Sequence, residues 1–223
     1  TALAVSLYLM RIIHSPESWV LSVGHFTDMA PYTHRYDWMR IYHQSTGSRT
    51  EDYLRTKDYF FRYDRGVTIV TPNSFLGRLF LGRFITSART LMLVKKFRRW
   101  IPPEKIPVTV DVFIPFSKVS LFMDWYRREM DHFPLWCVPY KLVRRYEWIS
   151  GDFLSRVKDE LFLDLAIYGM KKKGDKNVYR ILEEKLMDTG GIKTLISGNY
   201  YTESEFWKIW NKDKYDRIKR QTD

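Results

Sequence analysis

The stretch that decides the fold is VTVDVFIPFSKVSLFMDWYRREMDHFPLWCVPY, residues 108–140. Aliphatic residues occupy alternate positions from Val108 to Ile114. This period of two is typical of a β-strand with one buried face. Apolar residues recur at helical spacing in 117–130, and a short apolar run follows at 135–140. The stretch therefore predicts a strand, a helix and a second strand.

The chain beyond this stretch continues to alternate between strands and helices. We expect strands at 160–168 and 192–197, and a helix at 177–187 that Gly190-Gly191 ends. This order of elements predicts an α+β fold, in which an antiparallel sheet has helices packed on one face.

The chain ahead of residue 108 has a different character. Two apolar runs separated by a Ser-Pro-Glu-Ser turn predict a β-hairpin over residues 9–25. Thr50 can cap a helix that begins with Glu51 and Asp52, because their carboxylates suit the positive end of a helix dipole. We expect that helix to run towards Tyr63.

Two further helical stretches are expected at 74–84 and 87–100. Together with the preceding helix they form a helical insert at about residues 50–103. No Gly/Ser-rich linker divides the chain and no repeat is visible, so we expect a single α+β domain over residues 1–223.

The chain is strongly basic, with a formal net charge of +11. Its positive charge gathers in short clusters between apolar stretches, for example Lys95-Lys96 and Arg98-Arg99 in the insert. Such clusters are typical of solvated faces, of a membrane surface contact or of contacts with cofactor phosphates. No nucleic-acid-binding motif accompanies them, so we expect no nucleic acid partner.

Several kinds of functional site are not indicated. The sequence has no G-x-G-x-x-G or G-x-x-x-x-G-K-[ST] phosphate loop, and Cys137 is its single cysteine. His25, His34 and His43 recur every nine residues, but no carboxylate or thiol joins them at ligand spacing. We therefore expect no metal site.

Two carboxylates interrupt the apolar strands. Asp111 lies in VTVDVFIP and Asp164 in LFLDLAIYG, and each can point to the opposite sheet face from its neighbours. They are either solvated carboxylates on an exposed face or polar groups that line a ligand cavity there.

Three segments resemble the Δ24-sterol reductases. Residues 110–140 run strand, helix, strand as in that family, and end in a proline followed by aliphatic, Trp, Cys and Pro residues. ELFLDLAIYG, residues 160–169, is similar to the family's acidic, aliphatic strand with its closing Tyr-Gly. Residues 196–223 are similar to its C-terminal segment, with a Glu-Phe-Trp triplet at 205–207. Weaker similarity extends the match to residue 9.

The resemblance implies a member of the vanillyl-alcohol-oxidase flavoprotein superfamily. Such proteins have an N-terminal FAD-binding domain, followed by an α+β cap whose sheet forms one wall of the substrate cavity. We expect that FAD-binding domain to be absent from this chain, so that this fragment alone is inactive. We expect the full-length protein to reduce an alkene in a sterol or other lipid-like substrate, with FAD as cofactor and NADPH as electron donor. An intracellular location, cytoplasmic or at the endoplasmic-reticulum membrane, is expected on the same grounds.

The resemblance also assigns substrate-binding residues. Trp136, Tyr168 and Tyr201 are expected to supply the apolar wall of the cavity and its phenol donors, and Asp111 to line it. Plain core packing is the alternative role for each aromatic residue.

Candidates for catalysis and for cofactor contact come from the same segments. Alkene reduction needs an acid that protonates one carbon, and Tyr200 is the first candidate for it, with Asp164 the second. Lys219 lies in the segment that resembles a flavin-contacting tail, so it is expected to touch FAD unless it is a surface lysine.

The insert places Arg and Lys beside Leu and Phe, which suits a helix lying on a membrane surface. A lipid bilayer is therefore an expected partner. The competing class of protein is a non-catalytic basic module that binds nucleic acid, a membrane or a protein partner.

Overall fold

The computed structural model describes residues 8–15, 18–64, 75–82, 84, 86–97, 100, 107–170 and 176–222. Contacts divide the chain into two units, the first formed by Thr1–His14 and Ser18–Pro107, the second by Ser15–Glu17 and Val108–Asp223. The main division thus falls where the alternating valines begin. The single-domain organisation expected from the sequence stays a prediction.

The second unit contains the sheet. In chain order its elements are β3 (Val108–Pro115), the 3-10 turn η4 (Phe116–Lys118), α5 (Val119–Glu129), β4 (Leu135–Lys141), α6 (Gly151–Arg156), β5 (Leu161–Met170), α7 (Val178–Thr189), β6 (Ile192–Lys193), α8 (Glu203–Ile209) and α9 (Lys212–Thr222). Its strands lie in the order β4-β5-β3-β6, and every neighbouring pair is antiparallel. The predicted α+β fold is confirmed.

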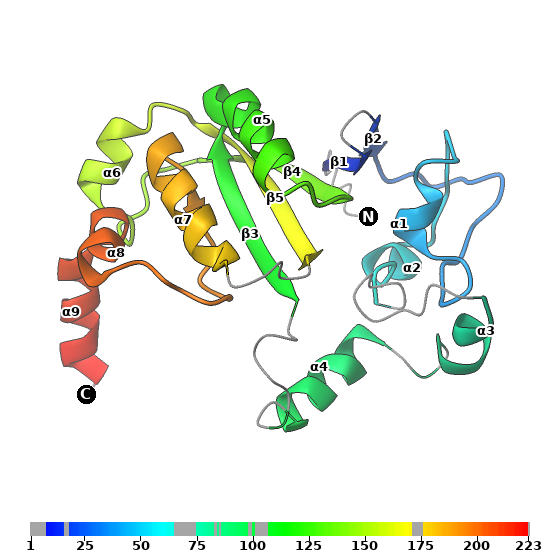
Figure 1. Ribbon diagram of the computed structural model, residues 1–223. Coiled ribbons are helices and arrows are strands. Elements are labelled where there is room, and N and C mark those ends of the chain that lie inside the picture. The colour runs from blue at the N-terminus through cyan, green and yellow to red at the C-terminus, as the bar shows by residue number, and fades with distance from the viewer. Residues whose placement is uncertain are drawn as a thin grey trace. The chain divides into compact units, whose positions relative to one another are not determined.

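One face of this sheet is buried beneath helices. On β3 the alternating residues from Val108 to Ile114 are fully buried, as their period predicts. The register places Val112 opposite Leu165 and Leu165 opposite Cys137, so buried residues line up across three strands. Helices α5 and α7 pack on this side (Figure 1). Their side chains buried there include Phe122, Met123, Tyr126, Leu182 and Leu186. We call it the helix-covered face.

Two glycines end α7 as predicted. Gly190 adopts the left-handed conformation with φ of 70°, and its N–H donates to the carbonyl of Leu186. A Cβ on Gly191 would lie 2.7 Å from the carbonyl oxygen of Phe113. The chain can therefore turn back tightly against β3 only with glycine at this position.

A smaller apolar cluster lies beside the sheet in the same unit. Ile149 and Ile209 belong to it, with Phe153 and Leu154 of α6. Tyr201 is the fifth buried member. The helix α8 begins at a capping box in which Thr202 and Glu205 satisfy each other's backbone N–H groups.

The first unit carries the predicted hairpin and the helical insert. Its elements are β1 (Tyr8–Ser15), β2 (Ser18–Gly24), α1 (Tyr42–Ser45), α2 (Thr56–Phe60), α3 (Phe75–Gly77), the π-helical turn η1 (Arg78–Gly82) and α4 (Ser87–Phe97). β1 and β2 are hydrogen-bonded to each other, which confirms the hairpin. Arg98 and Arg99 lie outside the described residues.

The prediction that a helix begins at Glu51 is wrong. The structure begins α2 at Thr56, with Arg55 rather than Thr50 as the N-cap. The carboxylate of Asp52 is engaged elsewhere, because it accepts hydrogen bonds from the Tyr36 hydroxyl at 2.5 Å and from Arg49 at 2.8 Å. These bonds favour extended backbone around Asp52 over a first helical turn.

The strand predicted at 192–197 is shorter than expected. Only Ile192 and Lys193 pair with β3. The Nζ of Lys193 donates to the carbonyl of Gly198, so the chain curls around the lysine instead of continuing along the sheet.

Candidate functional site

The second face of the sheet, opposite the helix-covered face, holds both interrupting carboxylates. Residues opposite one another in antiparallel strands point to the same side. Asp111 is opposite Ala166, which is opposite Trp136, and Asp164 is opposite Phe113. The prediction that the carboxylates leave the apolar side of their strands is thereby confirmed.

The Asp111 carboxylate is bound by a neighbouring phenol. The hydroxyl of Tyr168 donates to Asp111 Oδ1 at 2.5 Å, and both side chains are partly buried. Burial raises the pKa of Asp111, while the hydrogen bond from Tyr168 lowers it. Burial and the Asp111 carboxylate together raise the pKa of Tyr168. The two groups therefore form a fixed pair in which the phenol keeps its proton.

Asp164 is the more unusual carboxyl group. Only 8% of its surface is exposed, and its Oδ1 has no hydrogen-bond partner among the described residues. Burial, followed by the negative charge of Asp111, raises the pKa of Asp164 from 3.8 to about 7. A carboxyl group with such a pKa exchanges its proton near neutral pH, as a general acid must.

Aromatic rings surround these carboxyl groups. Phe113 and Tyr140 meet edge to face with ring centroids 5.4 Å apart, and Tyr140 is 49% exposed. Trp136 is half-buried on the same face. The second face thus combines flat apolar surface with one carboxyl group of raised pKa and one fixed carboxylate, which suits a flat, largely apolar ligand with a single reacting group.

The structure separates Tyr200 and Tyr201 from this face. Tyr200 stacks on Tyr179 of α7, with centroids 6.0 Å apart and planes inclined by 15°, and α7 packs on the helix-covered face. Tyr201 belongs to the apolar cluster between α6 and α8, where its buried hydroxyl has no hydrogen-bond partner among the described residues. Lys219 is an exposed residue of α9.

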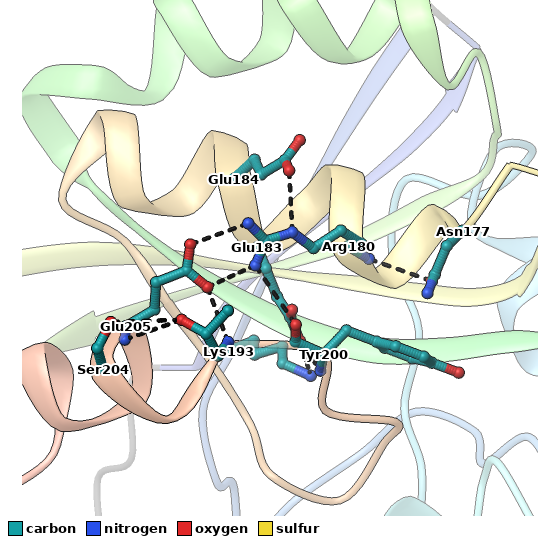
Figure 2. Close-up of polar contacts among 9 residues, drawn as sticks. Asn177, Arg180, Glu183, Glu184, Lys193, Tyr200, Ser204 and Glu205 are labelled. Carbon is teal, nitrogen blue, oxygen red and sulfur yellow. Dashed lines mark hydrogen bonds and ion pairs between the residues drawn. The ribbon is translucent and has the colours of Figure 1, made fainter.

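Polar contacts fasten the segment around Tyr200 to α7 (Figure 2). Lys193 and Glu183 form a fully buried ion pair at 2.8 Å, and Glu183 also accepts from the N–H of Tyr200 at 2.9 Å. Arg180 donates two hydrogen bonds to Glu205, at 2.6 and 2.9 Å, and thereby lowers the pKa of Glu205 to about 2. These contacts hold the segment around Tyr200 against α7.

Two hollows in the second unit lie away from the carboxyl groups. One of about 680 Å³ lies between α6 and α8 and includes Arg156 and Trp207. The other, of about 310 Å³, includes His132 and Ile181. Among the described residues no three His, Cys, Asp or Glu side chains gather as metal ligands. Neither hollow is lined by Asp111 or Asp164, so the candidate site is defined by the second face of the sheet.

Sequence reasoning missed Phe113, Val138 and Tyr140, which share the second face with the predicted residues. Phe113 has the same parity as Asp111 along β3, so the alternation alone could have found it. Val138 and Tyr140 needed the register between β4 and β5, which a single sequence does not contain.

Fold and site together define an α+β sheet domain that presents an aromatic, carboxyl-bearing surface. Sequence comparison places it near one group of enzymes. The chain is 21% identical over 196 residues to a Delta(24)-sterol reductase of Arabidopsis thaliana, a match that covers 76% of this chain and 35% of the relative. It is 20% identical over 201 residues to a Delta(24)-sterol reductase homolog of Caenorhabditis elegans, with 83% and 36% covered. For the Delta(24)-sterol reductase of Rattus norvegicus the identity is 23% over 123 residues, with 53% and 23% covered.

The predicted resemblance to the Delta(24)-sterol reductases is confirmed by these matches. This chain is sterol-reductase-like in sequence, and it spans about a third or less of the length of these relatives. No family model matches it. No solved structure matches it either.

Proposed function

We propose that this chain is the substrate-covering part of an FAD-dependent oxidoreductase that reduces an alkene in a sterol or other lipid-like molecule. The observation that carries the proposal is the second sheet face, where Asp164, Asp111 and Tyr168 lie among aromatic rings. The names of the relatives, all Delta(24)-sterol reductases, support the reaction class. NADPH as electron donor and an intracellular location, cytoplasmic or at the endoplasmic-reticulum membrane, belong to the same proposal.

The residues of the chain fit the role of a cover over a flat ring system. The second face offers flat apolar area, and burial of hydrocarbon there contributes roughly 25 cal/mol per Å². The sequence offers no glycine-rich loop for a pyrophosphate, so the phosphates of FAD belong elsewhere. When bound, FAD supplies the hydride chemistry, and the protein supplies position, exclusion of water and a proton. Contact between Lys219 and FAD stays a prediction.

Asp164 is our candidate for the proton donor. Its carboxyl group is neutral for part of the time at pH 7, and its unpaired oxygen leaves room for a partner from a ligand. Tyr200, the first candidate from sequence, stacks beside α7 on the other side of the sheet. The fixed Asp111–Tyr168 pair would position the substrate and, by its negative charge, help keep Asp164 protonated.

The test needs the gene product in its natural length. Asp164→Asn keeps the size and polarity of the side chain but removes the acid, so alkene reduction by pre-reduced enzyme in a single turnover should slow by about 10²–10⁴-fold. Bound flavin and its reduction by NADPH should stay normal. Tyr200→Phe is the matched control and should change the rate by less than about threefold, roughly 0.65 kcal/mol of barrier.

The opposite pattern would contradict the proposal for Asp164. A normal rate in Asp164→Asn with a large loss in Tyr200→Phe would return the proton donor to Tyr200. A natural-length protein without flavin, and without alkene reduction, would exclude the oxidoreductase altogether.

A further inference from the structure

Large apolar side chains are exposed along the helical insert of the first unit. On α3 and η1, Phe75, Leu76 and Phe80 expose 63–68% of their surfaces. On α4, Met92, Leu93 and Phe97 expose 47–65% of theirs. Scattered exposed apolar residues are ordinary, but such a density within a short segment marks an interaction surface.

The helix α4 shows how these residues combine with positive charge. Arg89, Met92, Leu93, Lys96 and Phe97 occupy positions i, i+3, i+4, i+7 and i+8, and all five are exposed. At 3.6 residues per turn they share one side of the helix. The ammonium group of Lys96 lies 5.8 Å from the centroid of the Phe97 ring. This side is too apolar for a solvated helix face and too cationic for a protein core.

The charge of the insert is of one sign. Between residues 75 and 100 the sequence has seven Arg and Lys residues and no Asp or Glu. A surface of this kind is complementary to a negatively charged one that also accepts hydrocarbon side chains. Anionic lipid headgroups over acyl chains provide both, whereas nucleic acid would leave the Leu, Met and Phe side chains in water.

We propose that α4, together with α3 and η1, docks on the surface of an anionic lipid bilayer. The apolar side chains would enter the boundary between headgroups and acyl chains, and Arg89, Lys95 and Lys96 would contact lipid phosphates. None of the described helices could span a bilayer. The inference does not depend on the proposed enzyme activity, because it uses only residues of the insert.

The experiment is flotation of the 223-residue chain with vesicles of phosphatidylcholine alone or mixed with phosphatidylserine. The parent chain should float with the mixed vesicles, and less so as salt is raised. Changing Arg89, Lys95 and Lys96 together to Gln should weaken binding on the order of a hundredfold at low salt, because each basic residue contributes about fivefold. The matched control changes three exposed cations of the second unit, Lys208, Arg217 and Arg220, to Gln and should retain most of the binding.

A second pair of variants tests the apolar contact. Met92→Ser with Leu93→Ser should weaken binding by on the order of tenfold or more, because it removes two buried hydrocarbon side chains. Leu195→Ser with Ile196→Ser is the control, since these residues are 49% and 75% exposed in the second unit. All substituted side chains are exposed, so each variant should fold, which circular dichroism checks.

Three results would overturn the inference. Equal losses of vesicle binding in the insert variants and the control variants would mean that binding depends only on the net charge of the chain. Retention of RNA without any vesicle binding would assign the basic residues to nucleic acid. Concentration-dependent dimers that Met92→Ser with Leu93→Ser abolishes, again without vesicle binding, would assign the apolar side to a second copy of the chain.

Discussion

At the scale of single residues, the Asp164 carboxyl group couples the stability of the sheet to pH. Its pKa is raised from 3.8 in the unfolded chain to about 7 in the folded one, so the folded state holds the proton more tightly. The contribution of Asp164 to the free energy of unfolding should therefore be largest below about pH 4 and fall as the pH rises to about 7. The loss should be on the order of 2–4 kcal/mol. Urea unfolding of the 223-residue chain at pH 4, 6 and 8 measures it.

Asp164→Asn should remove this contribution, because the amide does not ionise. The variant should lose less stability than the parent between pH 4 and pH 8, and above pH 7 it should be the more stable of the two. Asp188→Asn alters an exposed residue of α7 and should keep the pH dependence of the parent. The same slope in Asp164→Asn as in the parent would mean that Asp164 is solvated.

Tyr168 and Tyr201 should respond differently to loss of the hydroxyl group. Tyr168→Phe removes the donor of the 2.5 Å hydrogen bond to Asp111 and leaves a partly buried carboxylate without it. We expect a loss of about 1–3 kcal/mol at pH 8. Tyr201→Phe removes a buried hydroxyl that has no partner among the described residues, so it should cost nothing or increase stability.

Urea unfolding of both variants, with a double-mutant cycle through Asp111→Asn, separates the hydrogen bond from the packing of the ring. The cycle should give a coupling energy between Tyr168 and Asp111. Equal costs for the two Phe variants would show that ring packing alone is affected.

At the scale of elements, a buried ion pair joins helix α7 to strand β6. Lys193 and Glu183 are both fully buried at 2.8 Å, and removal of one partner leaves the other charge uncompensated. Lys193→Met should therefore destabilise the chain by about 3–5 kcal/mol. Glu183→Gln added to Lys193→Met should recover most of this, because the glutamine can still accept from the N–H of Tyr200. Thermal and urea unfolding measure both.

An exposed pair provides the comparison. Lys212 and Asp216 in α9 are also 2.8 Å apart, but their side chains are 49% and 39% exposed. Lys212→Met should cost less than about 1 kcal/mol. Similar losses for Lys193→Met and Lys212→Met would mean that water reaches Glu183 and Lys193.

Sequence predicts those elements whose secondary structure follows from the pattern of their own residues. The alternation from Val108 to Ile114 determined both β3 and the side on which Asp111 lies. The helix at Glu51 and the strand at 192–197 were mispredicted because hydrogen bonds of the Asp52 and Lys193 side chains outweigh local propensity.

The candidate site was predictable to the same extent. Alternation placed Asp111 and Asp164 correctly, and the register brought Trp136 and Tyr168 to the same face. Tyr200 and Tyr201 are adjacent to helix α8, and their positions depend on the Glu183–Lys193 pair and on the packing of α6 against α8. Neither arrangement follows from residue spacing.

At the scale of the whole molecule, we predict that the 223-residue chain does not retain a flavin by itself. Its sequence contains no phosphate-cradling glycine loop, and the described side chains of the second sheet face include aromatic rings and carboxyl groups. We predict that the purified 223-residue chain, incubated with FAD, loses the visible flavin absorption on gel filtration. The natural-length protein should retain it. A stoichiometric flavin band that elutes with the 223-residue chain would contradict this prediction.

The unpaired oxygen of Asp164 has a spectroscopic consequence. A protonated carboxyl group has an infrared carbonyl stretch that is separate from the amide bands, and its frequency depends on hydrogen bonding. Since Asp164 is partly protonated near pH 7 and its Oδ1 has no hydrogen-bond partner among the described residues, a ligand that reaches the second face should shift or remove this band. Binding could then be followed by difference infrared spectroscopy without a label, with Asp164→Asn supplying the assignment of the band.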